Sequence, residues 1–331
     1  MKPIAIPKRE WEKSLAFLLS SFDVFAPVEN EFSCDYVQLD AETIIHIAYN
    51  KAKPVTPLKK FFLPVKENVT VEATGSKPKL ILGAPNCDVM ALELLDQIYL
   101  DKEYDDPAYA KRRESTTLIA TDCLSIQEHC HCTSYGIQPL ANESADLSLV
   151  LWEDQVLLTA YRKKGEDLLK AMGLNMAPEP EEALLSKLQE KRNHMAELLQ
   201  AKNKDLPDYD LTGKLVASAD QGSWLKYSSD CVSCGACSAI CPTCSCFLLI
   251  DKPGFQKIRQ LDTCQYPGFE RVAGGEDALH ILSERFRNRY MCKYVWKPEK
   301  YDHKACTGCG RCIETCIGQI NKNELFMELS N

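Results

Sequence analysis

The cysteines of this chain carry its most specific chemical signal. The 331 residues include 17 cysteines, and eight of these form two runs with the same spacing, C-x-x-C-x-x-C-x-x-x-C. The runs consist of Cys231, Cys234, Cys237 and Cys241, and of Cys306, Cys309, Cys312 and Cys316. Thiolates at this spacing bind cubane iron–sulfur clusters. The two runs therefore predict two [4Fe–4S] clusters.

The spacing also predicts how the ligands are shared. The first three thiolates of a run can surround one face of a cube, whereas the fourth lies too far along the chain and ligates the other cluster. The expected ligands are Cys231, Cys234, Cys237 and Cys316 for cluster I, and Cys306, Cys309, Cys312 and Cys241 for cluster II. Gly235 and Gly310 follow the second cysteine of each run. A residue without Cβ permits a tight turn of the backbone at that point.

Other uses of the two runs are weaker. Disulfides form in oxidising compartments, and the segment 1–4 lacks the charged-then-apolar layout of an export signal. A structural zinc ion needs one C-x-x-C pair with a second pair or a histidine, not two identical four-cysteine runs. We therefore expect a reducing, cytoplasmic location, and the oxygen lability of such clusters indicates an anaerobic setting.

A third group of cysteines lies in the first half of the chain. Cys123, Cys130 and Cys132 occupy a loop after the expected strand 117–120, and Cys87 lies just after the expected strand 80–82. If these strands are adjacent in a parallel sheet, their loops emerge at the same edge. Four thiolates would then converge, which is enough for a third [4Fe–4S] cluster.

Two alternatives remain open for this third group. A zinc ion is one, because His129 or His131 can serve as a ligand beside the thiolates. Buried free thiols are the other, since cysteine is a common core residue. The same core role is expected of the remaining cysteines, although those near the runs can also line a cluster or form a site of their own. These are Cys34, Cys244, Cys246, Cys264 and Cys292.

The residue pattern predicts an α/β region followed by a mainly α-helical, ferredoxin-like region. Short β-branched and apolar runs predict strands over 43–48, 80–82, 117–120, 147–151 and 155–161, the last two forming a hairpin, with helices over 8–19 and 88–100. We expect an α/β domain at 1–175, a helical connector at 176–213 and a two-cluster domain at 214–331. The connector helix, 181–203, could equally pack as an outer helix of the first domain. Between the runs, 64 residues suit a helical extension, with a helix over 277–290.

Charge and hydropathy exclude some partners. The formal net charge of −8 argues against nucleic acid and against an anionic membrane surface. Apolar stretches are too short to cross a bilayer. The basic residues Arg259, Arg271, Arg285, Arg287 and Arg289 favour a solvated helix face over a role beside the clusters, where they would raise a cluster's reduction potential.

The chain resembles the dicluster iron–sulfur proteins of soluble multi-component redox complexes. Examples are the beta subunit of sulfhydrogenase-type NiFe hydrogenases and the corresponding iron–sulfur component of anaerobic sulfite reductase. The segments that carry the resemblance are Lys59 to Pro64, Asn86 to Asp88, Asp106-Pro107, Asp122-Cys123, Cys130 to Cys132, Cys231 to Cys246, Asp262 to Cys264 and Cys306 to Cys316.

The resemblance implies a non-catalytic electron-transfer subunit. Such a protein passes single electrons between a flavin- and NAD(P)-binding subunit and a catalytic subunit, which is a hydrogenase, a sulfite reductase or a heterodisulfide reductase-like enzyme. The sequence has neither a G-x-G-x-x-G motif after a strand nor a G-x-x-x-x-G-K-[ST] motif. The main alternative is a stand-alone iron–sulfur reductase with a small-molecule site near Cys87 and Cys132. A regulatory sensor is a further alternative, against which the acidic balance speaks.

Overall fold

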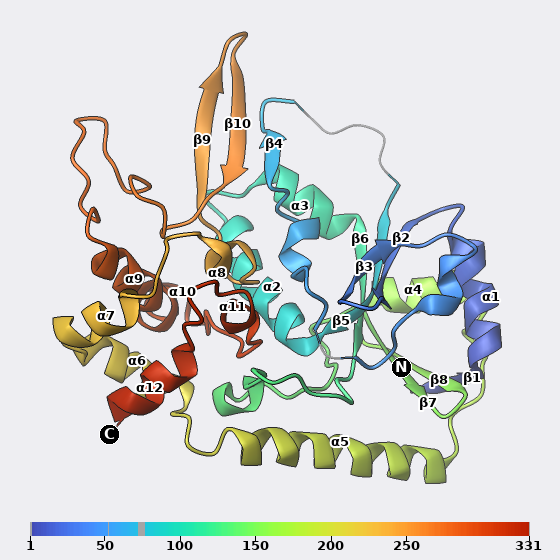
Figure 1. The fold of residues 1–331 in the computed structure, drawn as a ribbon. Coiled ribbons are helices and arrows are strands. Elements are labelled where there is room, and N and C mark those ends of the chain that lie inside the picture. Colours follow the sequence, from blue (N-terminus) through green and yellow to red (C-terminus); the bar gives the residue numbers. More distant parts are fainter. Residues whose placement is uncertain (1, 52, 72–76, 331) are drawn as a thin grey trace.

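A computed structural model describes residues 2–51, 53–71 and 77–330, and Figure 1 shows an α/β region followed by a mainly helical region. The first region contains a seven-stranded sheet of order β1-β8-β7-β6-β5-β2-β3. Its strands are β1 (Ile4–Pro7), β2 (Asp23–Glu29), β3 (Cys34–Gln38), β5 (Lys79–Pro85), β6 (Thr116–Thr121), β7 (Leu147–Trp152) and β8 (Gln155–Ala160). The central strands β2, β5, β6 and β7 are parallel, and the outer pairs are antiparallel.

Helices cover both faces of this sheet. Helices α1 (Lys8–Leu18) and α4 (Lys163–Ala171) pack on one face, and α2 (Asn86–Tyr99) and α3 (Pro107–Glu114) on the other. The burial of strand β5 reflects this arrangement, because Leu80 and Leu82 contribute to one core and Ile81 to the other. A continuous apolar run of this kind is typical of a parallel strand that is covered on both sides. The predicted α/β class, the hairpin of β7 and β8, and the strand–loop–helix unit at β5 are confirmed.

The expected strand at 43–48 is wrong. Residues Thr43–His46 form a 3₁₀ helix, η1. The side chain of Asp40 accepts hydrogen bonds from the backbone N–H groups of Glu42 and Thr43, at 3.0 and 2.9 Å. These local bonds offer the backbone an alternative to a sheet ladder, so the β-branched composition does not decide the outcome.

Helix α5 (Glu182–Lys202) packs against the α/β region as its outer helix, the second of the two arrangements expected for this segment. Its buried side chains are Leu184, Leu188, Met195 and Leu199. Leu184 and Leu188 contact the β7–β8 end of the sheet, and Leu199 packs beside Cys132. Figure 1 shows α5 running along the base of the molecule.

The second region surrounds the two cysteine runs with short helices. These are α6 (Tyr209–Ser218), α7 (Gln221–Ser228), α8 (Ala236–Ala239), α9 (Leu282–Met291), a π-helical turn η4 (Cys292–Trp296), α10 (Lys297–Tyr301), α11 (Arg311–Glu314) and α12 (Lys322–Ser330). An aromatic core joins them, in which Tyr290 stacks on Trp224 and meets Phe326 edge-on. The expected helix at 277–290 begins only at Leu282, because the Asp277 side chain holds the preceding loop through bonds to the backbone of Leu279 and Gly268.

A β-hairpin follows the first run, where the sequence predicted helices alone. Strands β9 (Phe247–Lys252) and β10 (Gln256–Leu261) form an arm that projects from the body of the molecule in Figure 1. Strand β10 also pairs with β4 (Lys66–Asn68), a strand of the first region. Hydrogen bonds between strands therefore link the two regions. Two side-chain bonds do so as well: Lys59 of the 3₁₀ turn η2 (Leu58–Phe61) donates to the Cys244 carbonyl, and Lys304 donates to the Tyr135 carbonyl of the 3₁₀ turn η3 (Cys132–Tyr135).

A buried ion pair fastens the second run to helix α2. The guanidinium of Arg311 binds both carboxylate oxygens of Asp88, at 2.5 and 2.8 Å, and both side chains are buried. The backbone N–H of Leu58 donates to the same carboxylate, and Arg311 Nε donates to the Pro54 carbonyl. Every polar atom of the pair thus has a partner, which compensates for the cost of desolvation.

We expect Asp88→Asn to destabilise the chain strongly. The variant keeps the shape of the side chain but leaves the buried Arg311 charge uncompensated, at a cost of about 3–5 kcal/mol. Urea unfolding of anaerobically prepared protein measures the effect as a lower midpoint. The matched control is Asp167→Asn, which breaks the exposed Lys163–Asp167 pair and leaves the midpoint in place. Equal midpoints for both variants would contradict the importance of the buried pair.

Candidate metal centre

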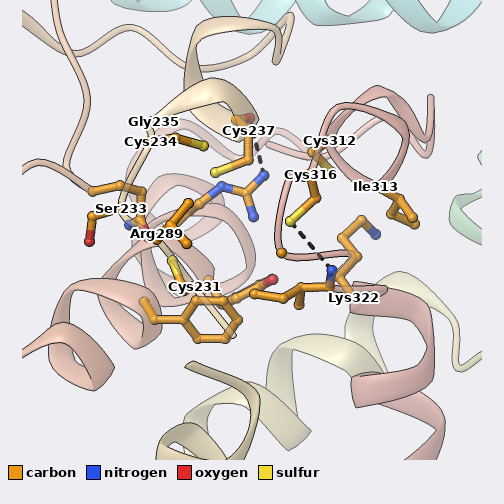
Figure 2. Close-up of a pocket in the computed structure, with 16 residues that line it drawn as sticks. Cys231, Ser233, Cys234, Gly235, Cys237, Arg289, Cys312, Ile313, Cys316 and Lys322 are labelled. Carbon is orange, nitrogen blue, oxygen red and sulfur yellow. Dashed lines mark hydrogen bonds between the residues drawn. The ribbon is translucent and has the colours of Figure 1, made fainter. Parts of the chain in front are cut away.

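The first three cysteines of the first run and the end of the second run line one cavity, called cavity I. Cys231, Cys234, Cys237 and Cys316, the expected ligands of cluster I, lie around it together with Cys312, and Figure 2 shows these thiols around the guanidinium of Arg289. Cys234 is exposed at the mouth.

The turn before helix α8 requires glycine. Gly235 has φ of +71°, and a Cβ there would lie 2.5 Å from the Thr263 side chain. Both the backbone conformation and the close approach exclude a larger residue. The glycine expected from the sequence therefore shapes the loop that carries Cys234 and Cys237 into cavity I.

The first three cysteines of the second run line a neighbouring cavity, called cavity II. Its walls include Cys241, Cys306, Cys309 and Cys312, the expected ligands of cluster II. Cys241 and Cys306 are buried. The chain thus brings the fourth cysteine of the first run beside the first three of the second, and Cys316 beside the first three of the first run.

The two cavities share a wall. Cys312, Arg289 and Lys322 line both of them. Two redox groups held in these cavities would lie next to each other with one layer of side chains between them.

Three buried cations face the thiols of the two cavities. Arg289, Lys293 and Lys322 are 4, 4 and 3% exposed. Lys293 Nζ lies 3.0 Å from Cys241 Sγ and donates to Thr243 Oγ1 at 2.8 Å. Arg289 donates to the Cys237 carbonyl at 3.3 Å, and among the described residues its Nε has no hydrogen-bond partner.

Lys322 is the third of these buried cations. Its Nζ lies 2.9 Å from His131 Nε2 and 3.2 Å from the Tyr294 hydroxyl. Burial and the neighbouring Lys322 hold the pKa of His131 well below its usual range, so that its imidazole is neutral and accepts this bond.

These cations test whether the residues fit an iron–sulfur cluster. Among the residues that the structure describes, none of the three forms an ion pair with a carboxylate. Buried charges in proteins are normally paired or coordinated. A cluster held by four thiolates would carry negative charge at this position and would compensate them, so the donors and the charges around both cavities fit the group.

The arginines depart from the expectation of a solvated face. Arg289 lies between the cavities, Arg259 pairs with Glu67 and Asp106, and Arg285 donates to the backbone carbonyls of Leu279 and His280. All three are buried. The expectation was wrong for Arg285 and Arg289 because the net polarity of 285–290 conceals a face that turns inward, and for Arg259 because it lies on strand β10 and not on a helix. Arg289 and Lys293, four residues apart, share one helix face, but this spacing does not show what the face contacts.

The cysteines of the first region also come together. Cys87, Cys123, Cys130 and Cys132 line one cavity, called cavity III. Cys309 lines both this cavity and cavity II.

The other cysteines fall into two groups. A hydrogen bond with Cys246 lowers the pKa of Cys264 to about 6. A hydrogen bond with Cys244 likewise lowers the pKa of Cys241. Cys34 lies on strand β3 and Cys292 begins the π-helical turn η4. Within the ranges described above, no three Cys, His, Asp or Glu side chains are grouped closely enough to hold a single metal ion, and no helix is long and apolar enough to cross a membrane.

Comparison with known proteins agrees with this geometry. Residues 230–320 match the family model of the 4Fe-4S dicluster domain. Over 319 residues the chain is 28% identical to sulfhydrogenase 2 subunit beta of Pyrococcus furiosus, and the match covers 92% of each chain. The predicted resemblance and fold class are confirmed: an α/β region precedes a helical region that carries a 4Fe–4S dicluster domain, in a chain similar to a sulfhydrogenase beta subunit along nearly its whole length.

Proposed function

We propose that the chain is an iron–sulfur electron-transfer subunit of a hydrogenase-like complex. It relays single electrons between a flavin- and NAD(P)-binding subunit and a catalytic redox subunit, in the cytoplasm and without substrate chemistry of its own. The relative's name, a beta subunit of a sulfhydrogenase, favours a hydrogenase as the catalytic partner over a sulfite reductase or a heterodisulfide reductase-like enzyme.

The observation that carries this proposal is the shared wall of cavities I and II. Cys312, Arg289 and Lys322 line both, which fits two adjacent clusters better than two isolated structural metals. When bound, a [4Fe–4S] cluster exchanges one electron at a time with a neighbouring redox centre. The proposed ligands are Cys231, Cys234, Cys237 and Cys316 for cluster I, and Cys306, Cys309, Cys312 and Cys241 for cluster II.

The chain's own residues position the proposed clusters and stabilise their reduced state. Thiols fix the positions of both clusters, and buried cations stabilise the more negative, reduced state. Cys234, at the exposed mouth of cavity I, places one proposed cluster close to the surface where a redox partner can dock. Cys241 and Cys306 are buried, so the second cluster is shielded from solvent.

Reduction by a nicotinamide tests the relay. In the native complex, purified anaerobically, we expect NAD(P)H to bleach the visible absorption of the clusters. The isolated chain should stay oxidised with NAD(P)H alone, because it lacks a flavin. An isolated chain that turns over NAD(P)H with a small acceptor would instead establish the stand-alone reductase.

Pairs of alanine variants test the exchange of fourth ligands. Cys316→Ala should abolish the same EPR component of the reduced protein as Cys234→Ala, because both residues serve cluster I in the proposal. Cys241→Ala should abolish the component that Cys309→Ala abolishes. Each variant should lose about four of about eight iron atoms per dicluster domain. The opposite pairing, with Cys316→Ala matching Cys309→Ala, would mean that each run binds its own cluster.

A further variant tests the buried charge. Arg289→Met should lower the midpoint potential of one or both clusters by roughly 50–150 mV, a Coulomb energy of about 1–3 kcal/mol, because the reduced state loses a compensating cation. Arg287→Met, two residues along the same helix and outside the linings of both cavities, should leave the potentials unchanged. EPR-monitored redox titration at equal iron content measures both. An unchanged potential in Arg289→Met would remove the guanidinium from any tuning role.

A further inference from the structure

Strands β5 and β6 bring two cysteines to one edge of the main sheet. The strands are adjacent and parallel, and Pro85 is paired with Thr121 at their carboxyl ends. Cys87 and Cys123 each follow two residues after this pair. They therefore leave the sheet side by side, at the edge where the loops of parallel strands meet.

The loop after β6 returns two more cysteines to the same place. The backbone N–H of Cys123 donates to the Pro139 carbonyl, and that of Ile137 donates to the Cys132 carbonyl. The Asn203 side chain, just beyond helix α5, donates to the Cys130 carbonyl at 3.0 Å. Cys130 and Cys132 thus face Cys87 and Cys123 across cavity III.

A buried cation accompanies these thiols. Lys53 is 4% exposed, its Nζ lies 3.7 Å from Cys130 Sγ, and it pairs with Glu314 at 2.7 Å. Cavity III therefore repeats the composition of cavities I and II, with cysteines around a space and a buried cation at its wall.

The histidines of this loop are engaged elsewhere. His131 directs Nε2 to Lys322, its Nδ1 lies 2.7 Å from the His129 carbonyl oxygen, and its side chain is not part of the lining of cavity III. The cavity offers five thiols and no imidazole among its described lining residues, and one of the five, Cys309, is already assigned to cluster II. This leaves a four-cysteine donor set, which suits an iron–sulfur cube.

The second run also contacts this loop directly. Gly308 has φ of +66°, and a Cβ there would lie 2.6 Å from the backbone of Cys132. The Gly308 carbonyl accepts a bond from the His131 N–H at 2.9 Å, and the neighbouring Cys309 lines both cavity II and cavity III. Cavities I, II and III therefore form a row, in which each shares a wall residue with the next.

We propose that Cys87, Cys123, Cys130 and Cys132 bind a third [4Fe–4S] cluster, at the opposite end of the row from cavity I. Its part in electron transfer rests on the proposed function, whereas its presence does not. Each transfer along the row moves one electron from a reduced cluster to its oxidised neighbour, with a reduced flavin as the donor class. Exposed residues of the loop, Ser125 and Glu128, place this end near a second surface.

Metal analysis of the full-length chain tests the proposal. Anaerobically reconstituted protein should contain about twelve iron atoms and as many acid-labile sulfides, against about eight for two clusters. The double variant Cys123→Ala/Cys132→Ala should lose about four of each, together with one EPR component, while the remaining components persist. Cys87→Ala, a second variant on another element, should give the same loss. The matched control, Cys34→Ala, should keep all of the iron.

The outcomes separate the two proposals. About eight iron atoms in the wild type, unchanged in the double variant, would overturn the third cluster and leave the relay of two clusters standing. A zinc ion that the double variant loses would overturn it as well. Fewer than eight iron atoms with an intact third-site signal would instead contradict the proposed dicluster relay. Persistence of the other EPR components shows that the variants are folded.

Discussion

Positive charge buried without a carboxylate partner is the constraint on which the C-terminal region depends. Arg289 and Lys293 project from consecutive turns of α9 and η4, and Lys322 from the start of α12, all toward cysteine thiols. Each would destabilise the fold if left uncompensated. The negative charge of the proposed clusters would remove that cost. Cluster binding would then stabilise the packing of these helices, as in other proteins whose sites form only when the metal is bound.

The same charges connect the cavities to one another. Arg289 and Lys322 line cavities I and II together, so an electron added to a cluster in either cavity would interact with the same two cations. Lys322 also binds His131, a neighbour of Cys130 and Cys132, so its influence reaches the first region. By contrast, Arg311 is paired with Asp88 and holds the two regions together without an unpaired charge. The paired cation Arg311 fastens the two regions together, whereas the cations without a carboxylate partner line the cavities.

The sequence predicted what depends on local pattern. The spacing of eight cysteines predicted which thiols gather around cavities I and II, and the apolar stripe of Leu184, Leu188, Met195 and Leu199 defined the buried face of α5. The parallel pairing of β5 and β6 was an assumption that the structure bears out. Features that depend on distant partners were missed. The hairpin β9–β10 has exposed residues on both faces and gains support from β4, nearly 200 positions earlier in the chain. Arg289 looked solvated because nothing near it in sequence shows what it faces.

The pairing of strand β4 affects whether the two regions can be separated. It belongs to the first region by position, yet its hydrogen bonds are made to β10, between the two cysteine runs. A dicluster segment cut out at residue 214 would carry β10 away without this neighbour and expose an open strand edge, which invites aggregation. The two regions are therefore held together by hydrogen bonds between strands as well as by the covalent chain. Transfer of the C-terminal region to another protein would therefore require a new neighbour for the edge of β10 that β4 covers.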